Sequence, residues 1–220
     1  MTDAMDPKVV IARRVAALIE PGWLVNLGIG LPSLVATYVP KEREVYFQAE
    51  NGVIGLGSRP PEGMEDPNLT DAGGGFVTAV PGAASIDSAM SFGLIRGGHL
   101  DMTVLGGLQV DEKGHLANWM VPGKMVPGMG GAMDLVAGAR RVVVAMQHTA
   151  RGAPKIVPEC TLPLTAARRV DWIVTELAVI QPTDAGLALR ERGPGVSVEE
   201  IRAATAARLI VEGDVPQMQI

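Results

Sequence analysis

Glu50 is the side chain whose setting most clearly indicates chemistry. It follows the apolar run 45–49 and directly precedes Asn51 and Gly52. The run is typical of a buried strand and Asn-Gly marks an abrupt turn, so the carboxylate lies where open α/β sheets place their ligands. Glycine also lets a large ligand approach the backbone closely. No Lys or Arg lies between Glu50 and Gly57 to neutralise it locally, so we interpret Glu50 as a functional carboxylate rather than a surface glutamate in a turn.

A second glycine-rich segment lies before a short apolar helix. Gly128, Gly130 and Gly131 precede Ala132 and the sequence Met-Asp-Leu. Glycines at a helix start leave backbone N–H groups free to bind an anionic ligand. The alternative is a tight turn whose only role is to lead the chain into the helix.

Taken together, these segments resemble the β chain (the B subunit) of 3-oxoacid coenzyme A transferases. The resemblance extends from about residue 11 to about residue 180. It also covers segments 26–32, 81–84, 96–101 and 105–110. Several motifs in matching order are more specific than one glycine-rich loop.

This resemblance implies CoA transfer, with coenzyme A (CoA) as a substrate and no permanently bound cofactor. Glu50 would attack an acyl-CoA, form an acyl-glutamyl anhydride, and then carry CoA as a glutamyl thioester in a ping-pong sequence. The resemblance assigns CoA or oxyanion contacts to seven residues, namely Asn26, Gly28, Gly30, Asn51, Gly130, Gly131 and Ala132. Lys124 and Arg96 are the cations that would balance phosphate charge.

Two positions depart from the family pattern. Ala49 stands where many relatives have a serine, so a hydroxyl just before the nucleophile is missing. Gly74 stands where many relatives have a lysine credited with CoA binding. Another cation must then replace that lysine if the nucleotide is held in the same way.

The resemblance also implies a partner. A separate α chain (the A subunit) is expected to complete the site, in a heterotetramer of two α and two β chains. The leading acids are succinyl-CoA as donor and acetoacetate or 3-oxoadipate as acceptor. Acetate- or butyrate-type transfer and acyl-CoA hydrolysis use the same nucleophile and remain open.

Two rival functions come from other classes. A dinucleotide-binding oxidoreductase would use Gly28 and Gly30 after a strand, with Glu50 about 20 residues further on. However, Ser33 stands in place of the third glycine and Pro32 breaks the spacing. The other rival is a CoA-binding protein without catalysis, which the presence of Glu50 disfavours.

Composition sets the outer limits. The chain has 220 residues, 47% hydrophobic and 20% charged, which fits one domain over residues 1–220. Its net charge of -5 disfavours a nucleic-acid surface. The single cysteine, Cys160, and the acidic N-terminus favour a cytoplasmic protein. The three histidines show no metal-ligand spacing, and no apolar run approaches membrane-spanning length, so we expect neither a metal site nor a membrane contact.

Strand and helix patterns alternate along the chain. This alternation predicts an α/β fold with an open, mostly parallel central sheet flanked by helices, of the kind that the CoA transferases share with NagB and RpiA. We expect helices from Pro7, over 32–38, 85–96 and 197–209, and strands at 23–27, 45–49, 102–107, 116–120, 141–146, 173–180 and 187–189. Residues 58–75 are predicted to form a long excursion, and residues 211–220 a frayed tail.

Overall fold

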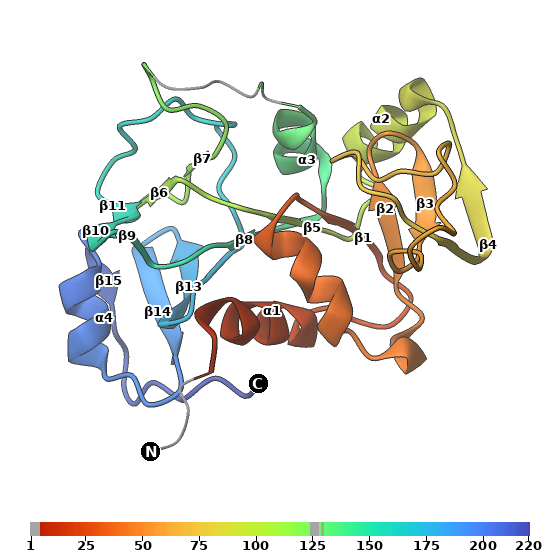
Figure 1. Cartoon of the computed structure of the whole chain (residues 1–220). Helices are drawn as coiled ribbons and strands as arrows, with labels where there is room; N and C mark the ends of the chain where they lie inside the picture. Colours follow the sequence, from red (N-terminus) through yellow and green to blue (C-terminus); the bar gives the residue numbers. More distant parts are fainter. Residues whose placement is uncertain (1–4, 124–127, 129) are drawn as a thin grey trace.

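The computed structural model describes residues 5–123, 128 and 130–220, and a ten-stranded sheet is its centre (Figure 1). In spatial order the strands are β15 (Leu209–Ile210), β14 (Gly186–Arg192), β13 (Ala178–Thr183), β12 (Trp172–Val174), β8 (Arg141–Ala145), β5 (Met102–Leu105), β1 (Leu24–Leu27), β2 (Tyr46–Ala49), β3 (Val53–Leu56) and β4 (Ala79–Ser85). The five strands from β12 to β2 are parallel to their neighbours, and antiparallel strands extend the sheet on both sides. The predicted fold class is therefore confirmed.

One predicted strand is in fact two. The segment 173–180 contains the end of β12 and the start of β13, which pair antiparallel. Thr175 explains the turn between them, because its hydroxyl accepts the backbone N–H groups of Leu177 and Ala178. A side-chain acceptor of this kind offers the backbone an alternative to the strand ladder.

Short strands form two further sheets beside the main one. They are β6 (Gln109–Asp111), β7 (Leu116–Ala117) and β11 (Ile156–Val157) in one, and β9 (Thr149–Ala150) and β10 (Ala153–Pro154) in the other. The second sheet is a tight hairpin with Arg151 and Gly152 at its turn, both with positive φ.

The first and last helices begin where the sequence predicts, whereas the helix expected over 85–96 begins at Ser88. The helices are α1 (Pro7–Ala17), the 3-10 helices η1 (Leu31–Tyr38) and η2 (Lys41–Arg43), α2 (Ser88–Arg96), α3 (Ala132–Gly138) and α4 (Val198–Ala204). The Asp6 side chain caps α1, and Ser197 forms a capping box with Glu200 at α4. Helix α4 ends earlier than predicted, because Thr205 is extended and the chain continues into β15.

Alternating side chains of the central strands divide the core between the two faces of the sheet. In β8, Val142 and Val144 join one apolar cluster, whereas Val143 and Ala145 join the other. The first cluster includes residues of α2, α3 and α4, and the second includes residues of α1 and η1. The parallel strands are buried on both faces, as is usual for parallel sheets. Their carboxyl ends therefore define the edge at which a ligand can reach the sheet.

The excursion is present and the tail is not frayed. Residues 57–78 contain no helix or named strand and connect β3 to β4. At the tail, Val215 and Met218 are buried, and the Met218 N–H donates to the Arg192 carbonyl at 2.9 Å. The prediction of fraying was wrong because these apolar side chains pack against the sheet. No helix in the described part of the chain is long and apolar enough to cross a membrane.

Candidate active site

Glu50 lies in the tight connection between β2 and β3. Ala49 and Val53 are paired across these strands, so Glu50, Asn51 and Gly52 form the turn. Gly52 has φ 121°, and a side chain there would collide with the Ile86 carbonyl. The Glu50 side chain is half-buried at the carboxyl end of β2, as the sequence predicted.

Asn26 of β1 holds one oxygen of the Glu50 carboxylate. Its Nδ2 donates to Glu50 Oε2 at 3.1 Å. Asn26 pairs in register with Gln48, and its side chain is 1% exposed. The predicted site residue Asn26 therefore contacts Glu50 directly.

The glycine-rich segment before α3 lies against the other side of Glu50. A Cβ on Gly131 would be 3.2 Å from Glu50 Cγ and 3.4 Å from Glu50 Oε1. Gly131 is buried, and Ala132 begins α3 beside it. Gly130 has φ 49°, in the left-handed region, so its own role includes the turn. Two segments about 80 residues apart in the sequence thus meet at the carboxylate.

Two polar residues near Glu50 were missed from the sequence. Gln48 Oε1 accepts from Asn26 Nδ2 at 2.9 Å, and Gln48 Nε2 donates to Ser91 Oγ at 2.9 Å. Gln48 lies two residues before Glu50 in a strand whose neighbouring positions are apolar. A buried amide in such a strand was the signal that could have revealed it.

The other predicted contacts lie in different surroundings. Gly28 donates its N–H to the Val104 carbonyl at 2.8 Å, and a Cβ there would be 3.2 Å from that oxygen. Gly30 precedes η1 with φ 85°. Asn51 donates to the Thr70 carbonyl at 2.8 Å and so anchors the excursion. Each of these three residues therefore has a structural role that does not require a ligand.

Of the two cations predicted to bind phosphate, Arg96 is already paired within the chain. It donates to Asp134 Oδ1 at 2.7 Å, and this hydrogen bond raises the pKa of Arg96. Its guanidinium also lies 5.5 Å from the centre of the Phe92 ring. The charge of Arg96 is therefore balanced without a ligand. The other cation, Lys124, lies outside the described residues.

A basic cleft of about 590 Å³ lies at the same edge of the sheet. It is lined by residues that follow β5 and β8, by Ile29 and by the cations Lys8, Arg151 and Lys155. Burial lowers the pKa of Lys155, and Glu176 partly opposes this shift. The cleft borders the excursion, because a Cβ on Gly73 would contact the Ile29 side chain at 3.3 Å. Among the described residues its lining includes three cations and no carboxylate, which suits an anionic group.

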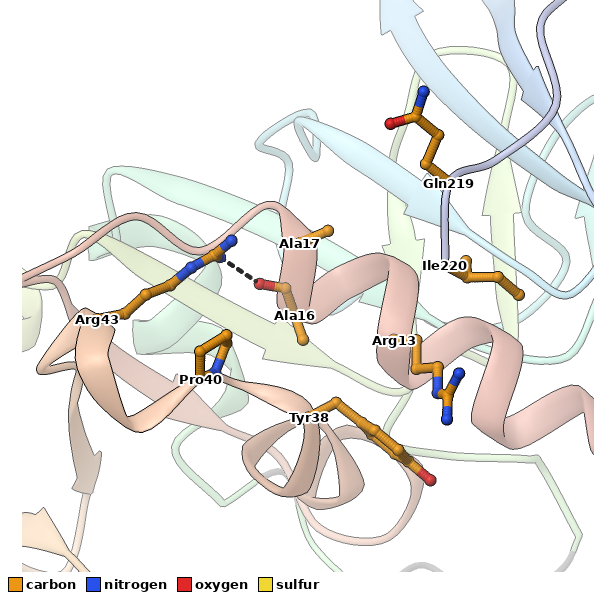
Figure 2. Close-up of a pocket in the computed structure, with 8 residues that line it drawn as sticks. All are labelled: Arg13, Ala16, Ala17, Tyr38, Pro40, Arg43, Gln219 and Ile220. Carbon is orange, nitrogen blue, oxygen red and sulfur yellow. Dashed lines mark hydrogen bonds between the residues drawn. The ribbon is translucent and has the colours of Figure 1, made fainter.

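A second hollow, of about 470 Å³, lies between α1, η1 and the C-terminal residues (Figure 2). Figure 2 shows Arg13, Tyr38 and Ile220 around it, with Arg43 bound to the end of α1. Its lining includes no residue that contacts Glu50. This hollow is therefore separate from the candidate site.

The remaining reactive side chains do not form a second centre in the described ranges. Among these residues, no group of three or more His, Cys, Asp and Glu is arranged to hold a metal ion. Burial raises the pKa of the Cys160 thiol to about 12, which disfavours the reactive thiolate.

Comparison with known proteins decides the family. The model of the coenzyme A transferase family matches residues 8–204. The chain belongs to the coenzyme A transferase family. The resemblance stated from the sequence is thus confirmed, and the oxidoreductase alternative is no longer needed.

The chain is 54% identical to the beta subunit of the acetate CoA-transferase of Escherichia coli K12 over 211 residues, covering 96% of each protein. It is 46% identical to the B subunit of the succinyl-CoA:3-ketoacid coenzyme A transferase of Helicobacter pylori 26695 over 202 residues, covering 91% of this chain and 97% of that protein. Among solved structures, an acyl-CoA transferase of Escherichia coli O157:H7 matches the whole chain with TM-score 0.79 and 22% identity. The chain covers 44% of that longer protein.

Proposed function

We propose that this chain is the β chain of a CoA transferase and that Glu50 carries CoA between two carboxylic acids. The observation that carries the proposal is the geometry of one carboxylate. Asn26 donates to Oε2, while Oε1 faces Gly131 of the glycine-rich segment. Among the described residues Oε2 accepts a hydrogen bond and Oε1 accepts none, so we take Oε1 as the oxygen that attacks.

The proposed sequence has two halves. Glu50 attacks the thioester carbonyl of the donor, the C–S bond breaks, and an acyl-glutamyl anhydride and CoA thiolate form. The thiolate then attacks the Glu50 carboxyl carbon, and the anhydride C–O bond breaks to release the donor acid. The acceptor acid reverses both steps and leaves as a new acyl-CoA, restoring the Glu50 carboxylate.

The first step is uphill in a simple comparison of leaving groups. A carboxylate whose acid has a pKa near 4.3 displaces a thiolate whose thiol has a pKa near 8.5. This difference in pKa corresponds to about 6 kcal/mol. Donors that bind the oxyanion on each tetrahedral intermediate reduce this barrier. When an intermediate forms at the Glu50 carboxyl carbon, Asn26 Nδ2 is already within 3.1 Å of Oε2.

We place the phosphates of CoA at the basic cleft. Gly74 brings no charge to the excursion, and Arg96 is paired with Asp134. Lys8, Arg151 and Lys155 line a cleft that borders the excursion through Ile29. Hydrogen bonds from such cations to phosphate are charge-assisted and therefore stronger than hydrogen bonds between neutral groups.

The proposed acids are small monocarboxylates of the acetate type. Two relatives, both named as the beta subunit of an acetate CoA-transferase, are 54% and 52% identical to the chain. Asn26, which bonds to Glu50, Gln48 behind it and Phe92 beside Gly131 all have neutral side chains. The succinyl-CoA and 3-oxoacid pair expected first from the sequence is the second candidate, because relatives with those names are 46% and 48% identical.

A partner α chain is part of this proposal, as are assembly of two α with two β chains and a cytoplasmic location. The relatives are named as beta or B subunits, and these names support the partner. We propose that the α chain supplies a second donor for the oxyanion, on the side of Glu50 opposite Gly131.

Reconstitution tests the proposal. The chain should be inactive alone and active when co-expressed with its α chain, as measured by transfer of CoA to a panel of acetate, butyrate, acetoacetate and 3-oxoadipate. Acetate should give the highest kcat/KM. Full activity of the isolated chain would contradict the shared site, and a preference for 3-oxoacids would select the second candidate.

A further inference from the structure

A chain of buried polar groups connects Glu50 to the interior. It runs from Glu50 Oε2 to Asn26 Nδ2, from Asn26 Nδ2 to Gln48 Oε1, and from Gln48 Nε2 to Ser91 Oγ. The distances between donor and acceptor are 3.1, 2.9 and 2.9 Å. Asn26 and Gln48 are 1% exposed and Ser91 is 0% exposed. The chain therefore links β1, β2 and α2 beneath the carboxylate.

The amide of Asn26 is held in one orientation. Its nitrogen faces three acceptors, namely Gln48 Oε1, the Gln48 carbonyl and Glu50 Oε2. Its oxygen is buried and has no hydrogen-bond partner in the described residues. Rotation of the amide by half a turn would place its oxygen against those three acceptors. The surroundings thus keep a donor on Glu50 and leave the amide oxygen unsatisfied.

Gln48 and Ser91 complete this orientation. The two N–H groups of Asn26 are shared among these three acceptors, with Gln48 Oε1 at 2.9 Å and both the Gln48 carbonyl and Glu50 Oε2 at 3.1 Å. Ser91 Oγ accepts from Gln48 Nε2, and in this arrangement the Gln48 amide presents its oxygen to the Asn26 N–H groups. Neither Gln48 nor Ser91 has a side-chain hydrogen bond to Glu50.

We propose that Gln48 and Ser91 are positioning residues for the transfer reaction. They hold the Asn26 N–H on Oε2, and this fixes Oε1 as the oxygen that attacks the thioester. The inference rests on the proposed function, since it assigns a role in the formation of the glutamyl intermediate.

A purely structural role is the competing explanation. Buried amides and hydroxyls must be bonded wherever they occur, and a network of them can simply join a strand to a helix. The two explanations differ in what they predict for the chemical step. A structural network affects stability, whereas a positioning network also affects the rate at which Glu50 reacts.

The test uses Gln48→Met in the enzyme reconstituted with its α chain, because Met has a similar shape and no amide. Single-turnover mixing with acetyl-CoA measures the rate constant for CoA addition to Glu50. We expect a fall of about 10- to 100-fold, with KM for acetyl-CoA within about twofold of wild type. Thr103→Val is the matched control, because Thr103 is 0% exposed, pairs in register with Asn26, and has a hydroxyl without a partner in the described residues. Its rate constant should equal that of wild type.

Ser91 provides a second variant that removes less of the core. Ser91→Ala should slow adduct formation by about three- to tenfold, and Ser91→Thr, which keeps a hydroxyl, should restore it. Wild-type rates in both Gln48→Met and Ser91→Ala would overturn the inference, as would an equal loss in Thr103→Val. Absence of an adduct on Glu50 in wild type would instead overturn the proposed function, so the two failures are distinct.

Discussion

Two buried polar clusters near the carboxyl ends of the parallel strands differ in how completely their groups are bonded. The Glu50 cluster comprises Asn26, Gln48, Glu50 and Ser91, and the His148 cluster comprises His148, Thr175 and Thr205. In the Glu50 cluster one carboxylate oxygen faces a glycine and the Asn26 oxygen has no partner in the described structure. In the His148 cluster both ring nitrogens are bonded.

The His148 ring joins three elements of the fold. Its Nδ1 lies 2.9 Å from Thr175 Oγ1, and its Nε2 lies 2.8 Å from Thr205 Oγ1. Because the Thr205 hydroxyl donates to the Ile201 carbonyl, it accepts from Nε2, and we assign the ring proton to that nitrogen. Burial, reinforced by the charge of Lys155, lowers the pKa of His148 to about 4. The ring is therefore neutral near pH 7 and fully bonded.

The difference teaches how a functional cluster is distinguished from a structural one. Both clusters are buried and polar, and both lie at the edge where a ligand can approach. Only the Glu50 cluster ends in a partly exposed carboxylate, one oxygen of which has no hydrogen-bond partner among the described residues. A closed network contributes stability, whereas an open one keeps hydrogen-bonding capacity for a substrate.

The largest effect is expected from Glu50→Ala. The variant should lose at least about 10⁴-fold in kcat because it lacks the covalent carrier. Its melting temperature should remain close to that of wild type, since Glu50 is half-exposed at a turn. Glu62→Ala, at an exposed position in the excursion, is the control and should be fully active. Activity near wild type in Glu50→Ala would remove the Glu50 cluster from the chemistry.

Gly131→Ala should have the next largest effect. Its backbone has φ -82°, which any residue adopts, so the new methyl group acts only by contact. That group would lie 3.2 Å from Glu50 Cγ and displace the carboxylate, lowering kcat by about 10- to 100-fold. Gly93→Ala in α2, where a Cβ meets nothing within 4 Å, should be neutral. If Gly131→Ala and Gly93→Ala have the same kcat, Gly131 only forms the turn before α3.

Arg151→Asn tests the basic cleft. Arg151 has φ 52°, a conformation that Asn tolerates, so the change removes charge without backbone strain. KM for acyl-CoA should rise about fivefold, equivalent to about 1 kcal/mol, with kcat unchanged. The difference should shrink at high salt. Lys41→Asn, at an exposed residue of η2, serves as the control. An unchanged KM at low salt would place the phosphates elsewhere.

His148→Gln should have the smallest effect on transfer and a clear effect on stability. The folded-state pKa of about 4 lies below the ordinary 6.5, so protonation favours the unfolded state. The neutral His148 ring therefore contributes about 3 kcal/mol to the free energy of unfolding above pH 6.5. This stabilisation is lost as pH falls toward 4. Urea unfolding of the reconstituted enzyme should show a shallower pH dependence in the variant across that window. A parallel pH dependence in the two proteins would contradict the closed, neutral His148 cluster.

The sequence predicted the parallel centre of the sheet because its strands are apolar runs buried on both faces. Runs such as 141–146 can be recognised as buried strands from their local composition alone. The hairpin between β12 and β13 was missed because Thr175, and not a glycine or proline, forms its turn. The tail was missed because Val215 and Met218 gain their contacts from β14, far away in the sequence.

The sequence predicted those residues of the candidate site that have a signal within a single segment. Glu50 and Gly131 have local signals, namely a turn after a strand and glycines before a helix. Gln48 has only the signal of an amide among apolar strand residues and Ser91 has none, because their role depends on the register of β1 with β2 and on the packing of α2. The pairing of Arg96 with Asp134 likewise depends on contact between α2 and α3. Long-range packing therefore determines the parts that the sequence did not reveal.

Peptide mapping after reaction with acyl-CoA is the most direct test of Glu50 as the carrier of CoA. The reconstituted enzyme is incubated with acetyl-CoA without an acceptor acid, quenched in acid, digested and analysed by mass spectrometry. The account predicts a CoA-sized mass on the peptide that contains Glu50, which disappears when acetate is added and does not form in Glu50→Ala. A CoA adduct on any other residue, or turnover with no adduct at all, would contradict it.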